Sequence, residues 1–200
     1  MTNLFTWCFM VLQWNLMSRS DSVQNIMLPH ITWAEDSLTI EEQGQKADQT
    51  GEDKFAKHIY ANPYEPFICP ILSLAVMIFC SSAREERRDL QLFTGTDSKG
   101  RFSKLLAQFL LDLSDAEKRL IGASISDLGT HSFRKGSGTY CLGQCGGPNP
   151  VSVNLRMGQS IGSIREKYIF EGDGADQLLG RFVSGLPFYH LTSQRMRNIF

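Results

Sequence analysis

Residues 4–17 have the sequence LFTWCFMVLQWNLM, which is apolar on almost every side when it is drawn as a helix. A helix without a polar face has to be surrounded by other elements of the fold. The segment is shorter than the roughly 20 apolar residues that cross a bilayer, and no basic residue precedes it as in a signal peptide. We therefore expect a buried helix in an intracellular protein, with no membrane partner.

The rest of the chain predicts a few short strands and then a run of helices. The strands are short runs bounded by turn residues, at 30–33, 37–41 and 57–61. Apolar steps of three and four residues, first-turn prolines and capping residues mark the helices. They are expected at about 22–27, 70–79, 102–113, 114 onward, 130–143, 151–157, 161–170 and 175–183, with a charged loop at 81–100. The predicted fold class is α+β, mostly α, with a small antiparallel sheet.

The distribution of charge matters more than its sum. The 200 residues have a formal net charge of −1, which by itself argues against a nucleic-acid binder. Residues 1–100 carry a net charge of −5, however, and residues 101–200 one of +4. An anionic partner is therefore expected to bind the second half of the chain.

The five cysteines are odd in number and irregularly spaced, which favours reduced thiols in an intracellular compartment. Cys141 and Cys145 lie four residues apart on a predicted helix. A zinc site there would need further ligands, and no second pair of thiols follows. We expect buried free thiols and no metal.

His131-Ser132-Phe133-Arg134 is the motif that most directly suggests chemistry. A histidine and an arginine three residues apart share one face of a helix. At the start of a helix they also lie near the positive end of its dipole, where a phosphate binds well. The motif alone more often marks an ordinary surface pair, so it needs support from elsewhere in the chain.

That support comes from Tyr168, which lies 34 residues after Arg134 and nine after Gln159. The run 158–168, GQSIGSIREKY, resembles the C-terminal signature of tyrosine recombinases, the phage-integrase superfamily, in which Gly and then His or Trp precede the nucleophilic Tyr. An arginine after the buried helix and a lysine in the expected hairpin turn resemble the first arginine and the lysine of this family. The full set, in the order of the family, is Arg19, Lys46, His131, Arg134, position 159 and Tyr168.

Other runs resemble the recombinases of Crypton-type eukaryotic mobile elements. They are HIYANP at 58–63, ICPILSLA at 68–75, KADQ at 46–49 and ADQLLGR at 175–181. The resemblance covers nearly the whole chain but only the catalytic domain of the family, expected at 1–187 with a tail at 188–200. It implies a nuclear protein without the N-terminal domain with which such enzymes grip DNA.

The resemblance also implies a mechanism on double-stranded DNA. Arg19 and Arg134 would clamp the scissile phosphate, Tyr168 would attack phosphorus, and His131 would transfer a proton. Lys46 would protonate the departing 5′ oxygen. The family needs no cofactor and works as a tetramer on two duplexes, so a homo-oligomer is expected. Further cations near the proposed site are candidate contacts to backbone phosphates: Arg156, Arg165, Lys167 and Arg181.

Gln159 departs from the family pattern. An amide can still donate a hydrogen bond to a phosphate, but it lacks the ring of His or Trp that packs the site. An alternative function is therefore a degraded or domesticated DNA-binding or interaction domain that does not cleave.

Residues 158–162 also fit G-x-S-x-G, the nucleophile elbow of serine hydrolases, with Asp173 or Asp176 and His190 following in order. That fold requires a parallel sheet before the elbow, and few strand candidates precede residue 158. A helix cap at Ser160 is the simpler interpretation.

Overall fold

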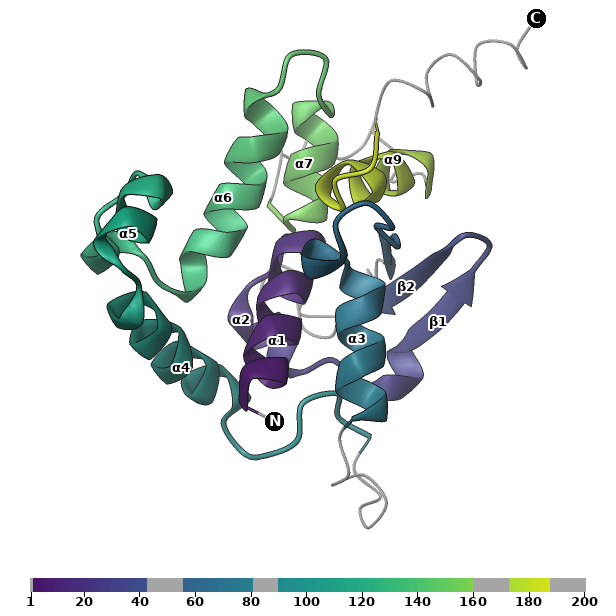
Figure 1. The fold of residues 1–200 in the computed structure, drawn as a ribbon. Helices are drawn as coiled ribbons and strands as arrows, with labels where there is room; N and C mark the ends of the chain where they lie inside the picture. The colour runs from purple at the N-terminus through teal and green to yellow at the C-terminus, as the bar shows by residue number, and fades with distance from the viewer. Residues whose placement is uncertain (1, 43–55, 81–89, 160–172, 188–200) are drawn as a thin grey trace, which may run out of the picture.

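The computed structural model describes residues 2–42, 56–80, 90–159 and 173–187. Helix α1 (Thr2–Leu16) lies at the centre and is the element around which the others pack (Figure 1). It contacts the following elements: α2 (Ser20–Gln24), α3 (Pro70–Phe79), α4 (Ser98–Asp112), α6 (Thr130–Gly143), α9 (Asp173–Val183) and strand β3 (Ala56–Ile59). The prediction of a helix in this segment is confirmed, and its central position is a feature of the fold.

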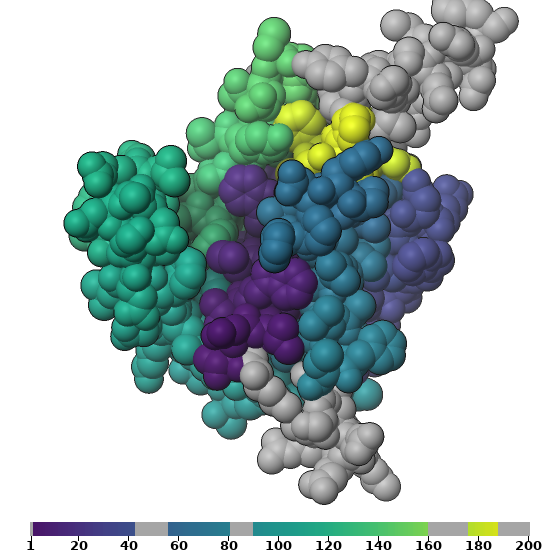
Figure 2. Space-filling view, in the orientation of Figure 1, coloured from purple at the N-terminus to yellow at the C-terminus, as the bar shows by residue number. Residues whose placement is uncertain are grey.

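One stripe of α1 is less covered than its sequence predicts. Leu4, Trp7, Met10 and Trp14, spaced three or four residues apart, are half-buried rather than buried. Part of α1 is visible between α3 and α4 in the space-filling view (Figure 2). An all-apolar helix gives no sign in its sequence of which side its neighbours leave open, so the stripe appears only in the fold.

The sheet has three antiparallel strands in the order β1 (Ile31–Ala34), β2 (Ser37–Glu41), β3. Ile31 pairs with Ile40, and Leu38 pairs with Ile59. The fully buried Ile40 and Ile59 join the core on one face of the sheet. Each predicted strand lies within one or two residues of an observed one. The fold class, mostly helical with a small antiparallel sheet, is confirmed.

Local signals place most of the other helices. Pro70 opens α3 at its first position, and the predicted capping box at Ser114 is present at the start of α5 (Asp115–Ile121). Asn149 caps α7 (Pro150–Arg156) through its side chain. Three short 3₁₀ turns complete the described elements: η1 (Leu28–His30), η2 (Pro66–Ile68) and η4 (Ile125–Asp127). The helix predicted at 161–170 lies outside the described residues.

The predicted charged loop at 81–100 needs correction in its described part. Leu92 and Phe93 are fully buried, and Leu92 N–H donates to the carbonyl of Ile26 at 2.8 Å. The ring of Phe93 lies 5.0 Å from that of Phe9 on α1. These two apolar residues attach the segment to the core, although the charged residues before them dominate its composition.

Two hydrophobic clusters make up the core. The larger lies around α1, α3, α4 and the sheet, and includes the stacked rings of Phe9 and Phe102, 4.3 Å apart. The smaller lies at the other end of α1, where Cys141, Val153 and Leu179 bring α6, α7 and α9 together. No helix among the described residues is both long and apolar enough to span a bilayer.

A buried ionic cluster fixes α9 to the sheet and to α7. The Asp176 carboxylate pairs with Arg156 and accepts hydrogen bonds from the backbone N–H of His58 at 2.7 Å and from its ring at 3.0 Å. Burial by itself raises the pKa of Asp176, but the positive charge of Arg156 and the hydrogen bonds from His58 outweigh it and lower that pKa to about 2.

The free energy of unfolding should therefore depend on pH through the ionisation of Asp176. Its folded pKa lies below its ordinary value of 3.8, so its contribution is complete above about pH 4 and is lost as the pH falls toward 2. The pKa difference corresponds to ~2 kcal/mol of unfolding free energy. Urea unfolding should show Asp176→Asn less stable than the wild type at pH 6, with a gap that narrows by that amount at pH 2. The exposed Asp127→Asn is the control, and a gap that does not change with pH would contradict the assignment.

Candidate functional site: the C-terminal turn of α1

Helix α1 ends in a left-handed turn, and Arg19 follows directly after this turn. Met17 has a φ of 53°, and its N–H donates to the carbonyl of Trp14 while Ser18 N–H donates to that of Gln13. This pair of bonds is a Schellman motif, in which glycine is the usual left-handed residue. Met17 is instead fully buried in the smaller core cluster. Arg19 follows in extended backbone as the N-cap residue of α2, half-buried.

Three cations from three different elements cap this end of α1. The carbonyl of Asn15 accepts from Arg156 on α7 at 2.9 Å, that of Leu16 from Lys57 on β3 at 3.0 Å, and that of Met17 from Arg134 on α6 at 3.0 Å. Carbonyls at the end of a helix lack partners within the helix and carry the negative end of its dipole. The three cations donate the missing hydrogen bonds and compensate the negative end of the dipole. These bonds hold α6, α7 and β3 at the end of α1.

Arg134 connects this turn to a second one. Its other terminal nitrogen donates to the carbonyl of Met157, directly after α7. There Gly158, with a φ of 58°, forms a second Schellman motif, because Gly158 N–H and Gln159 N–H donate back to Leu155 and Asn154. The exposed Gln159 is thus held two residues from the contact with Arg134.

Arg134 and Arg19 form a concentration of positive charge. Burial lowers the pKa of Arg134, the like charge of Arg19 lowers it further, and the carboxylate of Glu42 raises it. Among the described residues, no carboxylate forms an ion pair with either arginine. Two neighbouring guanidinium groups without a counter-ion can hold an anion with two or more acceptor oxygens, such as a phosphate.

The start of α6 is fixed to the same place. The buried side chain of Gln13 donates to the carbonyl of Thr130 at 2.7 Å, to Ser20 Oγ at 3.2 Å and to the carbonyl of Ser18 at 3.3 Å. His131 follows Thr130 as the second residue of α6, where its side chain is exposed. The positive end of the helix dipole favours an anion at this position.

The structure thus brings four predicted site residues to one end of α1: Arg19, His131, Arg134 and Gln159. Lys46 lies in the connection between β2 and β3, outside the described residues. Tyr168, Arg165 and Lys167 also lie outside them. The roles of these four residues stay predictions.

Two predicted phosphate contacts have partners within the protein. The side chain of Arg156 is 1% exposed and its charge is paired with Asp176, so a phosphate contact by Arg156 would require this buried pair to open. Arg181 is half-buried, pairs with Asp36 and lies over the ring of Tyr60 at 4.3 Å. A phosphate contact by Arg181 would have to compete with Asp36.

The alternative chemistries predicted from short motifs do not fit the fold. The residues before Gly158 form helix α7 and the described sheet is antiparallel, whereas a nucleophile elbow follows a strand of a parallel sheet. Cys141 is a buried free thiol whose pKa burial raises to about 11, while Cys145 is an exposed free thiol rather than a buried one. The described residues contain no group of three or more side chains suited to hold a metal.

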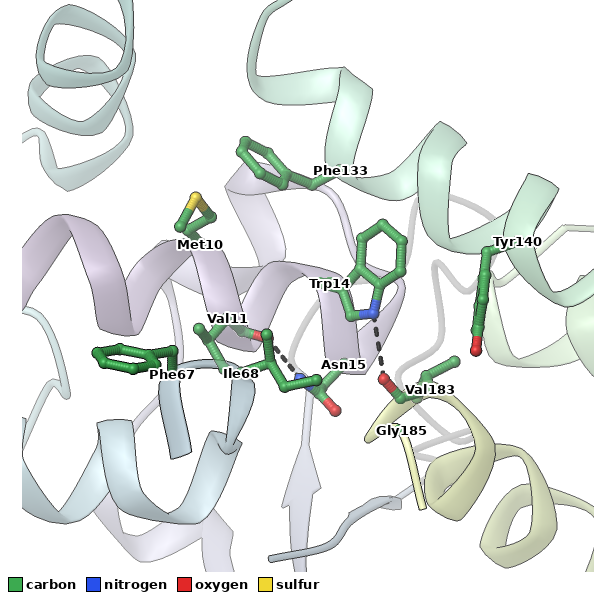
Figure 3. A pocket seen from close by; sticks show the side chains of 10 residues that line it. All are labelled: Met10, Val11, Trp14, Asn15, Phe67, Ile68, Phe133, Tyr140, Val183 and Gly185. Atoms are coloured by element: carbon green, nitrogen blue, oxygen red, sulfur yellow. Dashed lines mark hydrogen bonds between the residues drawn. The ribbon is translucent and has the colours of Figure 1, made fainter. Parts of the chain in front are cut away.

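A separate pocket of about 500 Å³ lies between α1, η2, α6 and the end of α9 (Figure 3). Trp14 stands in its wall, and the indole nitrogen donates to the carbonyl of Val183 at 3.1 Å. The described lining is uncharged: Met10, Val11, Trp14, Asn15, Phe67, Ile68, Phe133, Tyr140, Val183 and Gly185. It contains none of the predicted site residues, and its apolar walls do not suit a phosphate.

Several residues that shape the site escaped prediction. Lys57 could have been identified from the sequence, because it is a charged residue inside an expected strand and a lysine is almost never buried without a partner. Gly138 packs α6 against the second turn, since a Cβ there would lie 3.0 Å from the sulfur of Met157. Gln13 gave no signal, because one amide within an apolar run predicts no particular partner.

Removing Arg134 should destabilise the fold. Arg134→Ala leaves the carbonyls of Met17 and Met157 without their buried donor, so we expect a loss of ~2–4 kcal/mol of unfolding free energy. Lys135→Ala, the exposed neighbour on the same helix, should change it by less than ~0.5 kcal/mol. Urea denaturation measures both, and equal effects would refute the bridging role of Arg134.

Comparison with family models and with curated proteins gives no match. Among solved structures, the fold is similar to XerH site-specific recombinase bound to its difH substrate in a pre-cleavage complex, with a TM-score of 0.54 and 15% sequence identity. The similarity covers 82% of this chain and 42% of that one, so this chain spans about two fifths of the recombinase. The chain has the fold of a tyrosine-recombinase catalytic domain.

Proposed function

We propose that this chain is a catalytic domain that breaks and rejoins duplex DNA through a covalent 3′-phosphotyrosyl intermediate. The observation that carries the proposal is that Arg134, 115 residues after Arg19 in sequence, donates at 3.0 Å to the carbonyl of Met17, two residues before Arg19. Neither arginine forms an ion pair with a described carboxylate. This arrangement lies in a recombinase catalytic-domain fold.

The two arginines suit the transition state of phosphoryl transfer. Negative charge spreads over the non-bridging oxygens, and preorganised donors that face them supply a few kcal/mol each. Two carbonyls already fix the guanidinium of Arg134. A guanidinium has five N–H groups, so three remain for a ligand. Arg134 needs little reorganisation to bind a phosphate, and Arg19 supplies the second charge.

The remaining roles follow from the resemblance. Tyr168 attacks phosphorus, and the phosphotyrosine conserves the bond energy for rejoining. A phenol has a pKa near 10, so it needs a proton acceptor or nearby positive charge, and His131 is the candidate. Lys46 gives a proton to the departing 5′ oxygen. These steps use the residues of the chain alone.

The biological setting is part of the proposal. The recombinase with a similar fold was solved bound to its DNA substrate, which supports DNA as the partner. The runs that resemble Crypton-type recombinases are our reason for proposing integration of a eukaryotic mobile element in the nucleus. We further propose that several copies assemble on DNA.

Gln159 favours a second candidate function, a domain that binds DNA without cutting it. The family has a ring at this position, whereas here an exposed amide follows the second Schellman turn. The arginines can bind a phosphate whether or not the reaction proceeds, so binding and cleavage are separable.

A nicked duplex traps the covalent intermediate, because the short fragment that carries the free 5′-hydroxyl diffuses away after cleavage and cannot rejoin. We expect a DNA adduct with the full chain and none with Tyr168→Phe. An adduct that persists in Tyr168→Phe, or no adduct at all, would contradict the proposed cleavage.

A gel-shift titration of the same duplex against salt separates DNA binding with cleavage from DNA binding alone. Salt-sensitive binding without an adduct would support the second candidate, and no binding at any salt would exclude both.

Gln159→His should increase trapping if position 159 limits the reaction. One oriented donor to the scissile phosphate is worth about a hundredfold to a thousandfold in rate. Gln159→Ala is the matched control and should lower trapping or leave it unchanged. An equal gain in both variants would show that the ring of His supplies nothing specific.

A further inference from the structure

A buried ion pair is hydrogen-bonded to Ser18, the residue immediately before Arg19. Lys57 Nζ donates to Glu42 Oε2 at 2.8 Å, to Ser18 Oγ at 2.8 Å and to the carbonyl of Leu16 at 3.0 Å. Ser18 Oγ donates to the other oxygen of Glu42. Each of the two charged side chains is 3% exposed. Three partners therefore occupy the three N–H groups of Lys57, which gives it no free donor for a substrate.

Glu42 is placed where it could inhibit the site. Its carboxylate accepts a hydrogen bond from Ser18, next in the chain to Met17, whose carbonyl accepts from Arg134; the pKa of Arg134 is lowered overall by burial and by Arg19, and the negative charge of Glu42 opposes that shift. Ser18, whose hydroxyl bonds to it, is the residue immediately before Arg19. A carboxylate beside two arginines is a ready partner for them, and an arginine paired with it would be lost to a phosphate.

Lys57 and Ser18 hold the carboxylate of Glu42 in place, because each of its two oxygens accepts a hydrogen bond from one of them. No ion pair joins Glu42 to either arginine in the described part of the chain. We propose that Lys57 is a positioning residue that holds Glu42 away from Arg19 and Arg134, so that both arginines stay open to a phosphate. This inference rests on the proposed phosphate clamp and adds to it a control on its affinity.

A restraining role and a purely structural role predict opposite effects of Glu42 neutralisation on phosphate affinity. If Glu42 and Lys57 only stabilised the turn, loss of either partner would loosen Arg19 and weaken phosphate binding. If Lys57 restrains Glu42, loss of Lys57 frees a competing carboxylate and weakens binding. Neutralising Glu42 then removes the competitor and strengthens binding.

Titration of the full chain with inorganic phosphate tests this difference, followed through the guanidinium ¹⁵N NMR signals of Arg19 and Arg134. We expect Lys57→Met to weaken phosphate binding about tenfold and Glu42→Gln to strengthen it about threefold. The double variant should return to within about threefold of the wild type. Lys104→Met, an exposed lysine on α4, is the control and should change nothing.

Weaker binding by Glu42→Gln, or an unchanged affinity in Lys57→Met, would overturn the inference. If Lys57→Met does not fold, the sign of the Glu42→Gln effect still decides. A wild-type chain that binds phosphate at the arginines but never traps DNA would contradict cleavage and leave the inference standing. A wild-type chain whose arginines do not respond to phosphate would contradict both.

Discussion

The structure depends on how the C-terminal end of α1 is capped. An apolar helix that ends inside a protein leaves carbonyls that water cannot reach, and each unpaired one is costly. Here Arg156, Lys57 and Arg134 donate to three successive carbonyls. The interaction that completes the helix is therefore also the one that assembles α6, α7 and β3 around it. A site for an anion follows, because satisfying these carbonyls brings several cations to one place.

The three cations differ in whether a carboxylate of the protein already neutralises their charge. Arg156 is neutralised by Asp176 and Lys57 by Glu42, and both are almost completely buried. Arg134 has no ion pair to a described carboxylate, and the charge of Arg19 acts on it. The positive charges of Arg156 and Lys57 are thus neutralised inside the protein, whereas those of Arg19 and Arg134 are not. This explains how a chain with a net charge of −1 can still offer a site for a phosphate.

The sequence predicted the elements well and the buried pairs poorly. Helices α3 and α6 have the predicted bounds, because Pro70 and the spacing after Thr130 are local signals. The order of Arg19, His131 and Arg134 was visible in the sequence, and the fold brings them to one end of α1. Arg156 looked like a surface cation, because its partner Asp176 lies 20 residues away on another helix. The pairing of Lys57 with Glu42 depends on the register of the β2–β3 hairpin, which composition does not specify.

The central claim is that Arg19 and Arg134 together bind the scissile phosphate. A crystal structure of the full chain with a DNA duplex tests it most directly. We expect one backbone phosphate whose non-bridging oxygens lie within about 3 Å of nitrogens of both guanidinium groups. Glu42 should still be bonded to Lys57 and Ser18. A duplex bound at another surface, or a phosphate that Arg134 does not contact, would contradict the account.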